Sequence, residues 1–150
     1  MSSSRKSAVL LAALLALTPL ARAGAAEASK TEIKGAAILD HPCGKVAVKQ
    51  MGLIHAGKFD EANKLTTKEM QDQWKAMPAK DREMMTGMMK EMSKSEADFA
   101  KDIKASGTLT VDGSHGTLTI EQEHKDANGS STEKMTQNYV IDGKQCLISR

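Results

Sequence analysis

The residues best suited to chemistry lie in the stretch DREMMTGMMKEM, Asp81 to Met92, where five of twelve residues are methionine. Thioether sulfurs bind soft ions such as Cu(I) and Ag(I), and flexible methionines also form adaptable apolar surfaces. In a helix the five side chains share one arc of about 140°, since each residue advances by about 100°. Those methionines are Met84, Met85, Met88, Met89 and Met92.

Three interpretations of this methionine arc stay open. Phe99 and Ile103 extend the arc if the helix continues, and because neither can bind metal, this favours a helix face that fills the core. The arc is also wider than one neighbour covers, so it predicts a surface for a lipid, peptide or partner, with Met84 and Met89 at its edges. The third interpretation is a copper site, although no histidine clusters with the methionines. The candidate ligand-binding residues are the five methionines, Trp74 and Tyr139.

The chain has two cysteines, Cys43 and Cys146. An even number in an exported chain favours a disulfide, which would join the start of the first helix to the last strand. Free or intermolecular thiols are the alternative. His41 precedes Cys43 by two residues, but one histidine and one cysteine are too few ligands for a zinc site, so no metal site is predicted.

The remaining histidines suggest no catalytic site. His55 lies near the end of the first predicted helix, where an imidazolium suits the helix dipole. His115 belongs to a hairpin turn, and strand alternation places His124 on the face opposite Glu121 and Glu123. The sequence contains no G-x-S-x-G, P-loop or H-E-x-x-H motif. No catalytic residue or cofactor is therefore predicted, and enzymatic activity is left open.

The N-terminus has the pattern of a secretory signal peptide. Arg5 and Lys6 precede an apolar run over residues 8–17, and the triplet Ala21-Arg22-Ala23 predicts cleavage before Gly24. Removing three basic residues changes 21 basic and 19 acidic residues into 18 against 19, a net charge of −1. Nucleic-acid binding is therefore not supported. We expect a bacterial periplasmic or secreted chain with no membrane segment after cleavage.

The mature chain is expected to be one domain, residues 41–150, after a flexible lead over residues 24–40. Apolar periodicity predicts helices over residues 45–56 and 59–65, another from Thr66 or Thr67 to Trp74, and a methionine helix after Pro78. Ser93 followed by Glu96 is typical of a capping box and predicts a bend there.

After Lys104 the apolar period changes to two, which indicates strands. The candidates cover residues 107–113, 115–123, 133–143 and 144–150, separated by Asp112-Gly113, Asn128-Gly129 and Asp142-Gly143. Such pairs supply the positive φ of tight hairpins. The predicted fold class is α+β, with N-terminal helices packed on a four-stranded antiparallel meander.

Two segments resemble the nuclear transport factor 2-like (cystatin-like) superfamily, most closely its small secreted members. The first is HAGKFDEANKL, His55 to Leu65, and the second is DGKQCLI, Asp142 to Ile148. The resemblance implies a cone-like fold in which a curved sheet wraps a long helix and leaves a pocket. Gln145 stands where these proteins usually have tryptophan, and Lys58 where they have Asp or Asn, so the resemblance carries a fold and a pocket but no catalytic dyad.

The functional expectation is an exported, non-catalytic binding domain. It would hold a small apolar ligand or an envelope partner protein in the cone-like pocket or on the methionine helix. The alternatives are copper handling by the Met84–Met92 cluster and an isomerase- or cyclase-like enzyme of the same fold. A homodimer through the sheet is also predicted.

Overall fold

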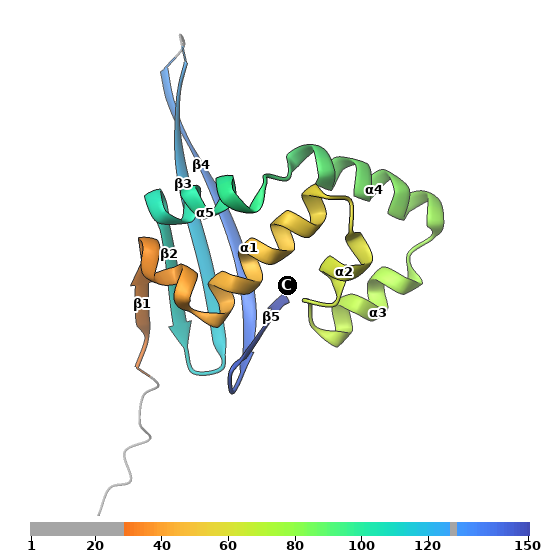
Figure 1. Cartoon of the computed structure of the whole chain (residues 1–150), viewed down its shortest axis with the longest axis horizontal. Helices are drawn as coiled ribbons and strands as arrows, with labels where there is room; N and C mark the ends of the chain where they lie inside the picture. The colour runs from red at the N-terminus through yellow and green to blue at the C-terminus, as the bar shows by residue number, and fades with distance from the viewer. Residues whose placement is uncertain (1–28, 127–128) are drawn as a thin grey trace, which may run out of the picture.

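The computed structural model describes residues 29–126 and 129–150, so the predicted signal peptide, residues 1–23, and its cleavage site lie outside the described residues. Within these residues, one sheet and five α-helices make up the fold (Figure 1). In chain order the elements are β1 (Thr31–Lys34), a 3-10 helix η1 (Gly35–Asp40), α1 (Pro42–His55), α2 (Phe59–Asn63), α3 (Lys68–Ala76), α4 (Ala79–Met92), α5 (Glu96–Ser106), β2 (Gly107–Asp112), β3 (His115–Asp126), β4 (Gly129–Asp142) and β5 (Gln145–Ser149).

The sheet is antiparallel, with strand order β1-β2-β3-β4-β5. This confirms the predicted α+β class but corrects the strand number from four to five. The additional strand, Thr31–Lys34, pairs Ile33 with Leu109 and lies in the segment that we expected to be a flexible lead. Its sequence TEIK has one inward apolar residue, which is too little to show a period of two.

The predicted hairpin turns are present at both Asp-Gly pairs. Gly113 and Gly143 have φ of 56° and 58°, which only glycine adopts without strain. The β3–β4 hairpin extends well beyond its neighbours (Figure 1), because the pairing with β2 stops at Ile120 and the pairing with β5 stops at Asn138.

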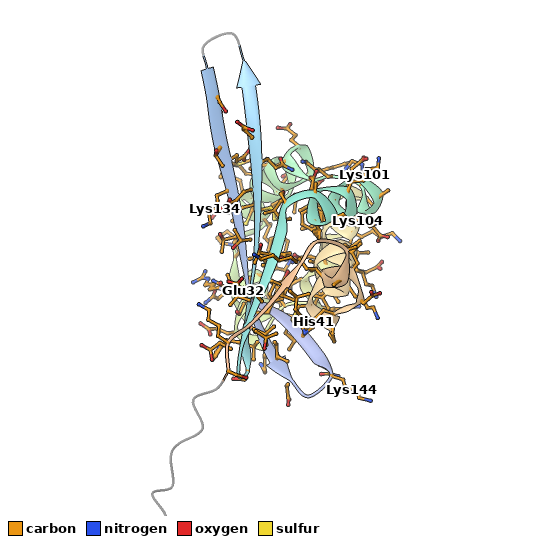
Figure 2. All side chains as sticks on the ribbon, turned by 90° about the vertical axis from the view of Figure 1, so that its left-hand side faces the viewer. Glu32, His41, Lys101, Lys104, Lys134 and Lys144 are labelled. Carbon is orange, nitrogen blue, oxygen red and sulfur yellow. A yellow bond between two sulfur atoms is a disulfide. The ribbon has the colours of Figure 1, made fainter. Side chains whose placement is uncertain are left out.

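The core lies between one face of the sheet and helices α1 and α5. Inward strand residues alternate with polar residues such as Thr108 and Thr119 on the open face, the pattern of a half-buried sheet. Figure 2 shows the helices on one side, with Lys134 on the other. The core cluster is Ile38, Cys43, Ala47, Phe99, Ile103, Leu109, Leu118, Ile120, Tyr139, Cys146 and Ile148.

The predicted bend after the methionine helix is confirmed, but its cap is a different serine. The helix stops at Met92, and Ser95 begins α5 by accepting a hydrogen bond from the Asp98 backbone N–H at 3.2 Å. Ser93 instead donates to the Lys90 carbonyl at 2.6 Å. The methionines and Phe99 are therefore on different helices, so they do not share one arc.

Across residues 29–126 and 129–150, no helix has the length and apolar character needed to cross a membrane.

Candidate functional site

The candidate site is a cleft of about 210 Å³ enclosed by α1, α2, α3, α4 and the residue after β5. It is separate from the hydrophobic core, which lies between the sheet and helices α1 and α5. Helices α2, α3 and α4 form an arc beside α1, away from the sheet (Figure 1), and this arc leaves the space. The cleft is lined by Gln50, Ile54, Phe59, Ala62, Asn63, Thr66, Met70, Gln73, Trp74, Met77, Met85, Met89 and Arg150.

Backbone pairing brings Arg150 to the cleft from the far end of the sequence. The Ile148 N–H donates to the Leu65 carbonyl at 2.9 Å, and the Thr67 N–H donates to the Ile148 carbonyl at 2.8 Å. These bonds extend the edge of the sheet with the loop between α2 and α3. Arg150 therefore lies beside these helices, where Figure 1 marks the chain end.

The structure divides the five predicted methionines between two faces of α4. Met85 and the half-buried Met89 line the cleft, whereas Met84, Met88 and Met92 are 65%, 58% and 77% exposed. The interpretation that the methionines fill the core is therefore wrong. Because the chain bends after Met92, α5 supplies the core residues while α4 stays away from the sheet.

Two cleft methionines, Met70 and Met77, were missed in the sequence. They join the predicted Trp74, which does line the cleft. The signal was present, since Met70, Trp74 and Met77 are spaced i, i+4 and i+7, the period of one helix face. The denser methionine stretch that follows concealed it.

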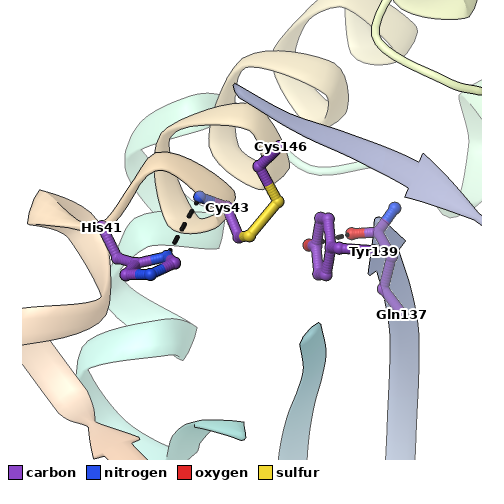
Figure 3. Close-up of a disulfide and its surroundings, with 5 residues drawn as sticks. All are labelled: His41, Cys43, Gln137, Tyr139 and Cys146. Atoms are coloured by element: carbon purple, nitrogen blue, oxygen red, sulfur yellow. Dashed lines mark hydrogen bonds between the residues drawn. A yellow bond between two sulfur atoms is a disulfide. The ribbon is translucent and has the colours of Figure 1, made fainter. Parts of the chain in front are cut away.

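Tyr139 is not a ligand-contacting residue, which corrects the prediction for it. It is 1% exposed and belongs to the core cluster. Its hydroxyl donates to Gln137 Oε1 at 2.7 Å (Figure 3), and Gln137 Nε2 donates to Oε1 of Gln50, a cleft residue, at 2.8 Å. Burial raises the pKa of Tyr139, so its hydroxyl stays protonated and able to donate.

The predicted disulfide between Cys43 and Cys146 is confirmed, with the two Cα atoms 5.0 Å apart. Figure 3 shows it beside the Tyr139 ring. It joins the first turn of α1 to β5 and is buried in the core cluster. Its role is therefore structural.

His41 caps α1. Its Nδ1 accepts a hydrogen bond from the Cys43 backbone N–H at 3.2 Å (Figure 3), which satisfies one of the unpaired donors at a helix start. Burial lowers the pKa of His41. Both effects favour the neutral imidazole, because a protonated Nδ1 cannot accept a hydrogen bond.

Neither His55 nor His115 is among the residues that line the cleft. His55 is the last residue of α1, as predicted, and its Nδ1 lies 3.4 Å from Ser93 Oγ. His115 is exposed at the start of β3, as predicted for a turn residue. The side chain of His124 lies outside the described part of the structure.

The described part of the chain shows no cluster of metal-binding His, Cys, Asp or Glu side chains, since no three of them converge as a metal site. Buried Nε of Arg82 lacks a hydrogen-bond partner there. Arg82 lines a separate shallow groove together with Asp60 and Glu83.

No protein-family model, curated protein or solved structure matches this chain. The resemblance to nuclear transport factor 2-like proteins therefore stays an expectation, and the functional argument depends on the geometry of the cleft.

Proposed function

We propose that this protein is an exported, non-catalytic binding domain that holds a small apolar ligand in the cleft beneath α4. The main support is the lining, in which Phe59, Trp74 and four methionines surround a space of about 210 Å³. A cavity of about 150 Å³ accommodates benzene, so a ligand with one ring or a short acyl chain has the right size. A cone-like, nuclear transport factor 2-like ancestry is part of this proposal.

The polar part of the lining favours binding over acid–base catalysis. It consists of three side-chain amides, one hydroxyl and one guanidinium, and it includes no carboxyl, imidazole or thiol group. An isomerase or cyclase needs a group that exchanges a proton at the reacting carbon. The polar lining residues are Gln50, Asn63, Thr66, Gln73 and Arg150.

Export is supported by two independent features. The N-terminal sequence has the charge and apolar pattern of a signal peptide, and the buried Cys43–Cys146 disulfide suits an oxidising compartment. We place the mature protein in the periplasm or outside a bacterial cell, and fractionation with N-terminal sequencing of the mature chain tests this. Recovery of the uncleaved, full-length chain from the cytoplasmic fraction would contradict this placement.

The single tryptophan makes the cleft function directly measurable. Trp74 lines the cleft, so an apolar ligand such as 1-octanol should shift its fluorescence in a saturable way. Met85→Lys, which places a charge in the cleft, should abolish the saturable shift. Met84→Lys is the matched control, because Met84 is the next residue in the helix but its side chain is 65% exposed and does not line the cleft. Equal effects of the two substitutions would contradict the proposal.

Soft-metal binding is the second candidate, and the structure changes which residues would carry it. Four thioethers, from Met70, Met77, Met85 and Met89, line one cleft, and such ligands suit Cu(I) or Ag(I). This set replaces the predicted Met84–Met92 cluster.

Silver titration followed by native mass spectrometry separates the two candidates. A Met70→Leu/Met89→Leu variant removes two sulfurs while nearly conserving volume, so it should lose silver and keep 1-octanol. Met84→Leu/Met88→Leu is the control and should keep both. Failure of the unmodified protein to bind silver would exclude the metal function and leave the apolar-ligand function intact.

A further inference from the structure

We infer that the ligand of the cleft is an amphiphile with an anionic head, held by the Arg150 guanidinium and the Gln50 side-chain amide, with its apolar tail among the methionines. This inference rests on the proposed function and adds the chemical class of the ligand.

The first step is the orientation of Gln50. Its Oε1 accepts a hydrogen bond from Gln137 Nε2, and Gln137 Oε1 in turn accepts one from the Tyr139 hydroxyl. Turning the Gln50 amide over would place two NH₂ groups against each other. The chain of hydrogen bonds therefore fixes Gln50 with its oxygen occupied and its Nε2 as the free end.

The second step is what that free end can bind. Within the described residues, Gln50 Nε2 makes no hydrogen bond, although Gln50 lines the cleft. An NH₂ group only donates, so a complementary ligand carries an acceptor. Among the other amides of the lining, Gln73 Nε2 already donates to Glu69 Oε1 at 3.4 Å. Asn63 accepts through Oδ1 from Thr66 Oγ1 at 3.2 Å, so its NH₂ group is a further donor for the same acceptor.

The third step is the charge of Arg150. In the described part of the chain no carboxylate side chain forms an ion pair with its guanidinium. Arg82, the other arginine near this region, shares its groove with Asp60 and Glu83. Among the described residues that line the cleft, Arg150 is the positively charged one and no acidic side chain lies beside it in the lining. A guanidinium binds carboxylates through paired N–H donors.

Together these steps assign a role to Tyr139, a residue that no ligand can reach. Tyr139 is a positioning residue, because it orients Gln137, which orients Gln50. The core and the cleft are therefore connected by side chains from β4 and α1. A carboxylate head would be the last acceptor in this series of hydrogen bonds from Tyr139 through Gln137 to Gln50.

The test compares octanoate with 1-octanol, which share a tail and differ in the head. Isothermal titration with unmodified protein should show octanoate binding about tenfold more tightly, as expected for hydrogen bonds to a charged group. Arg150→Gln should remove most of that preference and leave 1-octanol binding unchanged. Lys144→Gln is the matched control, since it removes the same charge in the exposed β4–β5 turn (Figure 2) and should change neither affinity.

Tyr139→Phe tests the positioning role, because it keeps the buried ring and removes only the hydroxyl. We expect octanoate affinity to fall severalfold with 1-octanol binding unchanged, and circular dichroism shows whether the fold is retained. If Tyr139→Phe unfolds the protein, Gln137→Leu removes the same link closer to the cleft and replaces Tyr139→Phe as the deciding variant. Equal loss of both ligands in the folded variant would overturn the positioning role.

The outcomes separate this inference from the proposed function. Equal binding of octanoate and 1-octanol, or a preference that survives Arg150→Gln, overturns the anionic head and leaves the apolar cleft standing. If Arg82→Gln and not Arg150→Gln removes the preference for octanoate, the head binds in the neighbouring groove and the Arg150 assignment is overturned. Failure of both ligands to bind overturns the cleft function and this inference with it.

Discussion

The helices of this protein fall into two groups that hold their shape by different means. Helices α1 and α5 bury Cys43, Ala47, Phe99 and Ile103 in the core beside the sheet, whereas α3 and α4 have no fully buried residue. The first group is fixed by a packed core and a disulfide. The second encloses a cleft and leaves Met84, Met88 and Met92 exposed outside its lining. The comparison teaches that a methionine-rich helix face need not be a core face, and that loose packing can leave room for a ligand.

The disulfide should show the largest difference between the two groups. Cys43→Ala with Cys146→Ala releases a loop with a sequence separation of 103, and a closed loop of about 100 residues contributes roughly 4.7 kcal/mol in the chain-entropy account. We expect urea unfolding to show a loss of this order. The control, Met84→Ala with Met88→Ala on exposed positions of α4, should stay within about 0.5 kcal/mol per site. Comparable losses would remove the distinction between the groups.

Two helical glycines should respond to alanine in opposite directions. A Cβ at Gly44 in α1 would collide with the Ile38 carbonyl, while a Cβ at Gly87 in α4 meets nothing within 4 Å. We expect Gly44→Ala to lower the free energy of unfolding by about 1–3 kcal/mol through overpacking. Gly87→Ala should raise it by roughly 0.5–1 kcal/mol, because alanine loses less conformational entropy in a helix. Thermal unfolding measures both, and a stabilising Gly44→Ala would show that η1 does not press on α1.

The smallest effect concerns pH and His41. Its folded pKa lies below the ordinary value of 6.5, so between the two values the unfolded chain binds more protons. The stabilisation is therefore fully present above pH 6.5 and is lost as the pH falls towards the folded pKa. The loss should not exceed about 1 kcal/mol, the usual worth of a helix cap.

Urea midpoints at about pH 7.5 and about pH 5, on either side of the ordinary histidine pKa, measure this loss. His41→Asn is the control, because asparagine caps a helix without titrating in this range. Unchanged pH dependence in His41→Asn would assign the effect to another group.

Features that depend on residues close together in the sequence, or on the number of cysteines, could be predicted from the sequence. The hairpins at Asp112-Gly113 and Asp142-Gly143, the stop after Met92 and the Cys43–Cys146 pair were all readable, since each depends on turn chemistry, breaks in periodicity or cysteine number. The strand β1 was not, because one inward residue, Ile33, carries no pattern. The long-range contact between Ile148 and the residues after α2 was equally invisible, and it is this contact that brings Arg150 to the cleft.

The sequence by itself determined that this chain forms an α+β domain with a disulfide and a helix presenting methionines on one side. Those features follow from period, turn residues and composition, which act over a few residues. Only the tertiary structure decided which neighbour that helix meets. Because α5 and not α4 covers the sheet, Met85 and Met89 face a cleft while Met84, Met88 and Met92 face outwards. Contacts between residues far apart in the sequence decide which side chains meet across the cleft. Helical periodicity is a local pattern and does not predict such contacts.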